Sequence, residues 1–159
     1  MKTLIIGLGN PILSDDGVGW KVVEQLQTIV NGQSSIVCET ASLGGLSLME
    51  RLIGYDRVIL VDSMETGQNP IGSVTVFPLE ALTNPMAGHS ASAHDTSLRT
   101  ALETGQRMGL AVPREVTVVA IEAAQVYEFS EELSPAVAAA VPVASQVVFE
   151  ILAMEKEPV

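Results

Sequence analysis

Five short β-rich runs alternate with helical patterns along the chain, and this alternation restricts the fold more than any other feature. The runs cover residues 2–6, 35–39, 57–61, 72–77 and 115–121. Residues 57–61 are nearly all apolar, which is typical of a central strand covered on both faces. Strands that alternate with helices favour a mostly parallel sheet. We therefore predict one α/β domain over residues 1–159, a three-layer α/β/α sandwich with a mostly parallel five-stranded sheet.

The segments between the runs carry helix signals. Apolar residues recur every four positions at Val18, Val22 and Leu26. Ser14 is a candidate N-cap for that helix, with Asp15 and Asp16 in a first turn where the helix dipole favours negative charge. A short helix after residues 44–45 is expected to bury Leu46, Met49 and Ile53. A last helix should begin at Ser134, with Pro142 kinking or dividing it.

The charge balance restricts the partners of the protein. Eight Lys plus Arg against nineteen Asp plus Glu leave a formal net charge of −11. Nucleic-acid binding depends on cationic side chains that displace counterions, so we expect no nucleic-acid partner. An anionic membrane surface is disfavoured for the same reason, whereas a basic or metal-bearing partner suits the charge. Cys38 is the only cysteine, which excludes an internal disulfide or a cysteine metal cage, and it is interpreted as a small hydrophobic residue.

The apolar segments do not indicate export or membrane insertion. The first residues lack the long apolar stretch and small-residue cleavage site of a signal peptide. Residues 135–154 are apolar, but Pro142, Ser145, Gln146 and Glu150 interrupt them, which favours a core helix. We expect a cytoplasmic protein, with a monomer as the default state.

Polar residues follow several strands directly. In open α/β sheets, ligands bind beyond the carboxyl ends of the strands. Asp15 and Asp16 follow the first run, Asp62 closes the third, and His89 and His94 lie in the loop after the fourth. Asp15 and Asp16 alone would be ordinary charges at a helix start, whereas Asp62 is costly after an apolar strand unless it is paired or functional. Together, the carboxylates and an imidazole could bind a metal or act as acid and base.

Two generic alternatives are weaker. The run Gly-Leu-Gly-Asn at residues 7–10 resembles a dinucleotide loop, but Ile12 stands where the third glycine belongs. Its glycines are better explained by a close backbone approach. A serine hydrolase could use Ser63 or Ser14, but no G-x-S-x-G elbow is present. Ser63 should also point away from Asp62 on an extended strand.

Residues 7–19, Gly-Leu-Gly-Asn-Pro-Ile-Leu-Ser-Asp-Asp-Gly-Val-Gly, closely resemble the N-terminal signature of the [NiFe]-hydrogenase maturation proteases. Two further segments resemble family features in the same order. Residues 59–62 match an apolar strand that ends in aspartate, Asp62, and residues 92–95 match a loop histidine, His94, before a helix. The resemblance spans almost the whole chain.

This resemblance implies an endopeptidase that removes a short C-terminal extension from the precursor of a [NiFe]-hydrogenase large subunit. It implies that the precursor has already received nickel, and that this nickel is the recognition element. The positions that match the family's metal contacts are Asp16, Asp62 and His94. Asp16 and Asp62 are also the candidate catalytic residues of an aspartic-type reaction, with one aspartate activating a water. No resident cofactor is implied.

Two departures from the family pattern and two other functions stay open. Many relatives carry glutamate at the position of Asp16, and residues 40–45 differ from the family's glycine-threonine turn while being expected to line the substrate cleft. A non-catalytic chaperone of the nickel-loaded subunit would use the same residues. Peptidyl-tRNA hydrolases share the initial Gly-Leu-Gly-Asn-Pro, but their catalytic histidine has no counterpart here before His89, and strong acidity suits tRNA poorly.

Overall fold

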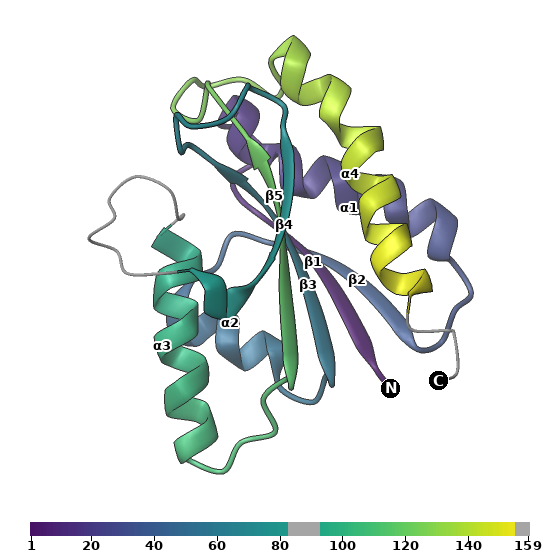
Figure 1. Ribbon diagram of the computed structural model, residues 1–159, viewed down its shortest axis with the longest axis vertical. Coiled ribbons are helices and arrows are strands. Elements are labelled where there is room, and N and C mark those ends of the chain that lie inside the picture. Colours follow the sequence, from purple (N-terminus) through teal and green to yellow (C-terminus); the bar gives the residue numbers. More distant parts are fainter. Residues whose placement is uncertain (83–92, 155–159) are drawn as a thin grey trace.

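The computed structural model describes residues 1–82 and 93–154, and the side chains of residues 93–97 lie outside this description. The strands are β1 (Thr3–Leu8), β2 (Ile36–Ala41), β3 (Arg57–Met64), β4 (Val74–Pro78) and β5 (Glu115–Glu122). The helices are η1 (Ser14–Gly17), α1 (Val18–Val30), α2 (Gly45–Leu52), η2 (Leu79–Ala81), α3 (Ala93–Arg107) and α4 (Pro135–Ala153), where η marks a 3₁₀ helix. Figure 1 shows their arrangement.

The five strands form one sheet in the order β2-β1-β3-β5-β4. All neighbours are parallel except β4, which pairs antiparallel with β5. The predicted mostly parallel five-stranded sheet is therefore confirmed. The third run was predicted to end at Asp62, but β3 continues to Met64, so Asp62 is paired with Ala120 of β5 within the strand.

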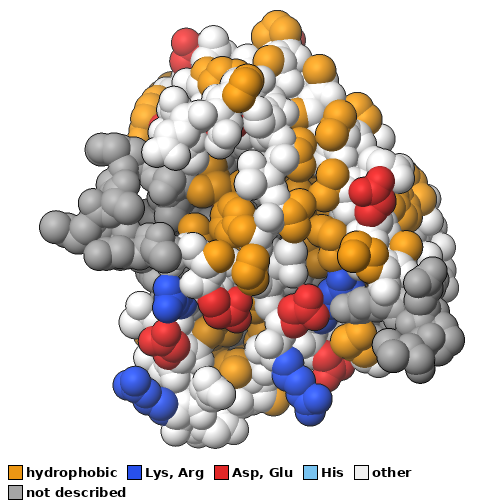
Figure 2. Space-filling model, viewed as in Figure 1, with side chains coloured by type: hydrophobic (Ala, Val, Ile, Leu, Met, Phe, Trp, Pro, Cys, Tyr) orange, Lys and Arg blue, Asp and Glu red, His pale blue; other side chains and the backbone are white. Residues whose placement is uncertain are grey.

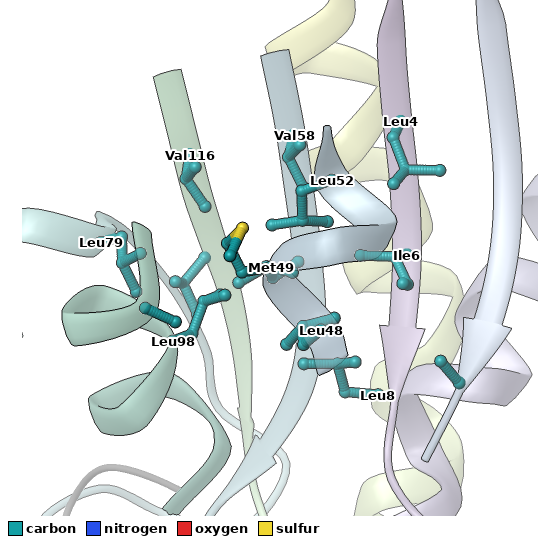
Figure 3. Close-up of a cluster of buried hydrophobic side chains, with 14 of the residues drawn as sticks. Leu4, Ile6, Leu8, Leu48, Met49, Leu52, Val58, Leu79, Leu98 and Val116 are labelled. Carbon is teal, nitrogen blue, oxygen red and sulfur yellow. The ribbon is translucent and has the colours of Figure 1, made fainter. Parts of the chain in front are cut away.

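Helices cover both faces of the sheet, α2 and α3 on one side and α1 and α4 on the other (Figure 1). Figure 3 shows the core under α2 and α3, where Leu4, Ile6 and Leu8 of β1 meet Leu48, Met49 and Leu52 of α2 and Leu98 of α3. The alternate residues of the same strands, such as Ile5 and Ile59, face α1 and α4. Each fully buried aliphatic side chain contributes about 1.5–3 kcal/mol. The predicted three-layer sandwich is present.

The predicted helix faces agree with the structure in part. Val18, Val22 and Leu26 of α1 are all fully buried, as the four-residue spacing indicated. The prediction for α2 was wrong at Leu46, which is 60% exposed, and Ile53 lies beyond the end of the helix. Cys38 is half-buried on β2, and this burial raises the pKa of its thiol, which suits a packing role better than a nucleophilic one.

Pro142 was expected to kink the last helix or divide it, and helix α4 runs undivided through Pro142. Pro142 and Ala138, whose carbonyl loses its helical partner, are both exposed, and water can satisfy that carbonyl. By length and composition alone, α4 could cross a membrane, and it is the one helix of residues 1–82 and 93–154 for which this holds. One stripe of it packs in the core against α1, through Val137, Ala140, Ala144 and Val148.

The order of the strands places a topological switch point beside β1. The chain leaves β1 through α1 to reach β2 on one side, and then returns through α2 to β3 on the other side. The helices after β1 and β2 therefore lie on opposite faces, and the carboxyl ends of β1 and β3 meet at a topological switch point. Ligands of doubly wound sheets bind at such points.

Candidate functional site

The loop after β1 is pressed against η1, and glycine makes this possible. Gly9 has a φ of +131°, and a Cβ there would overlap the backbone carbonyl oxygen of Asp16. A Cβ on Gly19 would likewise overlap the carbonyl oxygen of Val61 on β3. Side chains at either position would push the loop and the start of α1 off the strands. The close approach that the sequence indicated is confirmed, and it fixes where Asp16 stands.

Asp16 is half-buried at the carboxyl edge, and both of its carboxylate oxygens are held. The backbone N–H of Asn10 donates to Oδ2 at 2.8 Å, and the hydroxyl of Ser63 donates to Oδ1 at 3.3 Å. The carboxylate thus joins the loop after β1 to the end of β3. A carboxylate has about four lone-pair sites, so two hydrogen bonds leave acceptor capacity for a cation or a water.

Asp62 is 1% exposed, and its Oδ1 accepts the backbone N–H of Ser63 at 2.8 Å. Because side chains alternate along a strand, Asp62 lies on the face of Leu60 and Met64, toward α2 and α3. Ser63 lies on the other face, as predicted, and this brings its hydroxyl to Asp16. Asp16 and Asp62 therefore approach the same edge of the sheet from its two faces.

The histidines were predicted in the loop after the fourth strand, and this was wrong for His94. Its backbone lies in the first turn of α3, and its side chain lies outside the description. His89 lies wholly outside the described residues. Among the side chains that the structure describes, no group of three His, Cys, Asp or Glu is placed to hold a metal ion. The set of Asp16, Asp62 and His94 therefore stays a prediction.

Asp15 is fully buried, and four donors surround its carboxylate. Oδ2 accepts the N–H groups of Ala124 at 3.3 Å and Gln125 at 3.0 Å and the hydroxyl of Ser134 at 2.8 Å. Oδ1 accepts the N–H of Ser134 at 2.7 Å. The reading of Asp15 as an ordinary helix-start charge was wrong, because this side chain fastens η1 to the segment between β5 and α4.

Ser14 does not cap a helix. It lies inside η1 with a φ of +49°, in the left-handed region, while Gly17 occupies the N-cap position of α1. Its backbone N–H donates to the carbonyl of Ser130 at 2.8 Å, and its hydroxyl donates to the carbonyl of Glu132 at 2.8 Å. These bonds to the segment before α4 hold the strained backbone in place.

Two further carboxylates, not identified from the sequence, lie at the same edge. Glu122 closes β5, is 4% exposed and accepts the backbone N–H of Thr66 at 2.9 Å as well as its hydroxyl. Partial burial, and then the carboxylates of Glu122 and Asp16, raise the pKa of Glu65. An acidic residue at the end of an apolar strand was the signal that identified Asp62, and Glu122 shows the same signal.

Residues 40–45, predicted to line a substrate cleft, lie against the site loop. The hydroxyl of Ser42 donates to the carbonyl of Gly9 at 2.5 Å, and the indole N–H of Trp20 donates to the carbonyl of Ala41 at 3.2 Å. A small pocket of about 70 Å³ lies beside Glu122 of β5, with Met64, Thr66 and Phe77 among its lining residues.

The fold and the site define an open α/β protein with an acidic site at its topological switch point, suited to holding a cation or to acid–base chemistry. The family model of the hydrogenase maturation proteases matches residues 20–151. The chain belongs to this family, so the resemblance predicted from residues 7–19 is confirmed. The matched region begins just after that signature and contains Asp62 and His94.

Relatives of the chain are named for hydrogenase formation. The hydrogenase expression/formation protein HoxM of Azotobacter vinelandii is 25% identical over 150 residues, 94% of this chain and 72% of the relative. HupD of Rhodobacter capsulatus is 24% identical over 86% of this chain, and the match spans only 64% of the relative. The hydrogenase 2 maturation protease of Escherichia coli is 24% identical over 76% of this chain and 73% of the relative.

Solved structures share the fold. The hydrogenase maturating endopeptidase HybD from Escherichia coli superposes with a TM-score of 0.79 at 22% identity, covering 98% of this chain and 94% of that one. A hydrogenase 2 maturation peptidase from a Thaumarchaeota archaeon reaches 0.66 at 27% identity, covering 96% of this chain and 98% of that one. The α/β sandwich is thus the architecture of these endopeptidases.

Proposed function

We propose that the protein is an endopeptidase that removes the C-terminal extension of a nickel-loaded [NiFe]-hydrogenase large-subunit precursor. Membership of the hydrogenase maturation protease family supports this reading. The observation that carries it is the fixed carboxylate of Asp16, held by Asn10 and Ser63 at the switch-point edge, where β3 also carries Asp62. We also propose a cytoplasmic monomer without a resident cofactor.

In this proposal, Asp16, Asp62 and His94 contact nickel that the substrate carries. Carboxylates and a neutral imidazole suit a borderline divalent ion. Three protein groups leave coordination positions for the precursor's own ligands. A precursor without nickel lacks the group that anchors it, so cleavage is restricted to the loaded form. The carboxylates of Glu65 and Glu122 add negative potential at the same edge, which favours a metal-bearing substrate further.

The short side chain of Asp16 is fixed by its contacts. Its carboxylate lies within hydrogen-bond distance of the Asn10 backbone and of Ser63, so its position is set by two elements of the sheet edge. A short, fixed side chain loses little conformational entropy when it binds a cation.

For peptide cleavage we propose that one aspartate activates a water as general base. The water attacks the scissile carbonyl carbon as the aspartate takes its proton, and the protonated aspartate then gives that proton to the amine of the released extension as the C–N bond breaks. Asp16 and Asp62 are the candidates, since both reach the edge where the substrate must lie. Asp16 retains free acceptor sites for a water.

Single substitutions test the site. Asp62→Asn and His94→Ala should each abolish processing of the precursor, measured as its mobility shift on a denaturing gel, with unchanged thermal unfolding. His89→Ala is the matched control and should process at the wild-type rate. Normal processing by Asp62→Asn or His94→Ala would remove that residue from the site, and an inactive His89→Ala would show that the wrong histidine was chosen.

Turnover separates the enzyme from the competing functions. An endopeptidase releases many peptides for each protein molecule, whereas a chaperone co-purifies with the nickel-loaded precursor and releases none. Substoichiometric protein incubated with loaded precursor should therefore give product in excess of the protein. A filter-binding assay with tRNA addresses the peptidyl-tRNA hydrolase alternative, and retention of tRNA at physiological salt would favour it.

A further inference from the structure

The segment between β5 and α4, residues 123–134, exposes two aromatic side chains. Tyr127 is 83% exposed and Phe129 is 86% exposed. The whole chain has one Trp, two Tyr and three Phe, so two of its six aromatic residues lie exposed within three consecutive positions. Exposed aromatic clusters of this kind are typical of binding surfaces, where Tyr and Phe bury large areas in a partner. We call residues 123–134 the aromatic loop.

The aromatic loop is held in place before any partner arrives. Asp15 accepts hydrogen bonds from Ala124, Gln125 and Ser134, at both ends of the loop. In the middle, Ser130 donates its N–H to the carbonyl of Ile12 at 3.0 Å. A loop fixed in this way needs little further ordering on binding, which increases affinity.

The aromatic loop lies beside the candidate site. Its bonds go to Ile12, which is 48% exposed, and to the turn that carries Asp16. In Figure 1, the loop and η1 lie at the upper end of the sheet, near the start of α4, and Figure 2 shows hydrophobic side chains on the surface at this end. The loop is therefore within reach of a large substrate held at Asp16.

The charges of the aromatic loop indicate what it contacts. Glu128 stands between the two aromatic residues, and Glu131 and Glu132 follow them, all exposed. Residues 123–134 contain no Lys or Arg. A complementary surface therefore has an apolar depression bordered by basic side chains, because like charges at such a rim oppose association.

We propose that Tyr127 and Phe129 dock the folded body of the large-subunit precursor, inserting into an apolar depression with a basic rim outside the scissile segment. This inference rests on the proposed function, because it takes the precursor as the partner. The loop positions the precursor so that its metal-bearing end reaches Asp16. It acts in binding and takes no part in bond cleavage.

The test compares the variant Tyr127→Ser/Phe129→Ser with the control Met108→Ser, using nickel-loaded precursor as the probe. Met108 is 69% exposed beyond the end of α3, at the opposite end of the sheet. The double variant should raise KM about tenfold or more with kcat within about twofold, while the control matches wild type. Replacing Glu128, Glu131 and Glu132 by Gln should weaken the salt dependence of KM.

The outcomes separate this inference from the proposed function. An unchanged KM in the double variant, with an active wild type, overturns the docking role alone. A wild type that cleaves nothing overturns the proposed function. Binding of the precursor, measured by biolayer interferometry, then decides the docking role. Weaker binding by the double variant than by wild type supports that role, and equal or absent binding overturns it. A wild-type dimer that the double variant dissociates in sedimentation velocity shows that a second copy occupies the surface, and also overturns the inference.

Discussion

The two sides of the Ser14–Gly17 turn place neighbouring carboxylates in opposite circumstances. On one side, Asp15 is fully buried and four donors from Ala124, Gln125 and Ser134 converge on it. On the other, Asp16 is half-buried and accepts one hydrogen bond on each oxygen. Adjacent residues of the same type thus differ in the acceptor capacity that the fold leaves them. A saturated carboxylate serves the structure, whereas an unsaturated one can serve chemistry.

Of the substitutions around the turn, Asp16→Asn should produce the largest effect on function. The amide keeps the shape of the side chain but removes the charge that a cation or a general base requires. We expect it to abolish processing of nickel-loaded precursor, a fall of at least about 100-fold, as for Asp62→Asn and His94→Ala, with the midpoint of thermal unfolding nearly unchanged. Single-turnover kinetics and calorimetry measure the two quantities. A variant that unfolds instead of losing activity would make Asp16 a structural residue like Asp15.

Asp15→Ala should produce the largest effect on stability. It leaves the buried donors of Ala124, Gln125 and Ser134 without their acceptor, and we expect a loss of about 3 kcal/mol in the free energy of unfolding. Urea denaturation measures it. Asp15→Asn keeps the volume and one acceptor oxygen, so its loss should be smaller. If Asp15→Ala unfolded like wild type, the fastening role of Asp15 would be wrong.

Gly9→Ala should lower both stability and activity, because it disturbs the backbone under Asp16. The added Cβ meets the Asp16 carbonyl at a φ of +131°, and we expect a loss of about 2 kcal/mol together with reduced processing. Gly32→Ala is the matched control, with a φ of +93° and nothing within 4 Å of the added Cβ. Equal losses in the two variants would show that only the φ angle matters.

Glu65→Gln should give the smallest effect. Burial and the neighbouring carboxylates raise the folded-state pKa of Glu65 above its ordinary 4.5, so its ionised form is disfavoured in the folded protein. Neutralising it should stabilise the protein at pH 7 by less than about 0.5 kcal/mol. The difference should disappear as the pH falls through and below 4.5, where wild-type Glu65 is itself protonated. A difference that persists at low pH would indicate a lost contact instead of relieved repulsion.

Most of the fold could be predicted because its signals are local. The alternation of β-rich runs and helical patterns gave the layers, and the spacing of Val18, Val22 and Leu26 gave the buried stripe of α1. The buried face of α2 was harder to predict, because a helix of about two turns contains few repeats of the apolar spacing. Leu46, predicted to be buried, is exposed. The end of β3 was missed because Asp62 was read as a strand terminator, although its strand neighbours are buried.

Residues at the candidate site could be predicted only where a carboxylate lies in sequence near the carboxyl end of a predicted strand. Asp16 follows β1 by one loop and Asp62 lies near the carboxyl end of β3, so strand order alone places them at one edge. The partners of Asp15 could not be predicted, because Ala124 and Ser134 are more than a hundred residues away in sequence and donate through backbone groups that any residue carries. Glu65 and Glu122 were missed because Glu65 lies beyond the predicted end of its strand, and Glu122 was not weighed as a strand-ending acid.

The central claim is that cleavage at the edge where Asp16 lies requires nickel bound to the substrate. The most direct test is the intact mass of the large-subunit precursor after incubation with the protein, in parallel for nickel-loaded and nickel-free forms. We predict that the loaded form loses the mass of a C-terminal peptide and that the nickel-free form keeps its full mass. Equal cleavage of both forms would contradict nickel recognition, and no mass loss from the loaded form would contradict the endopeptidase itself.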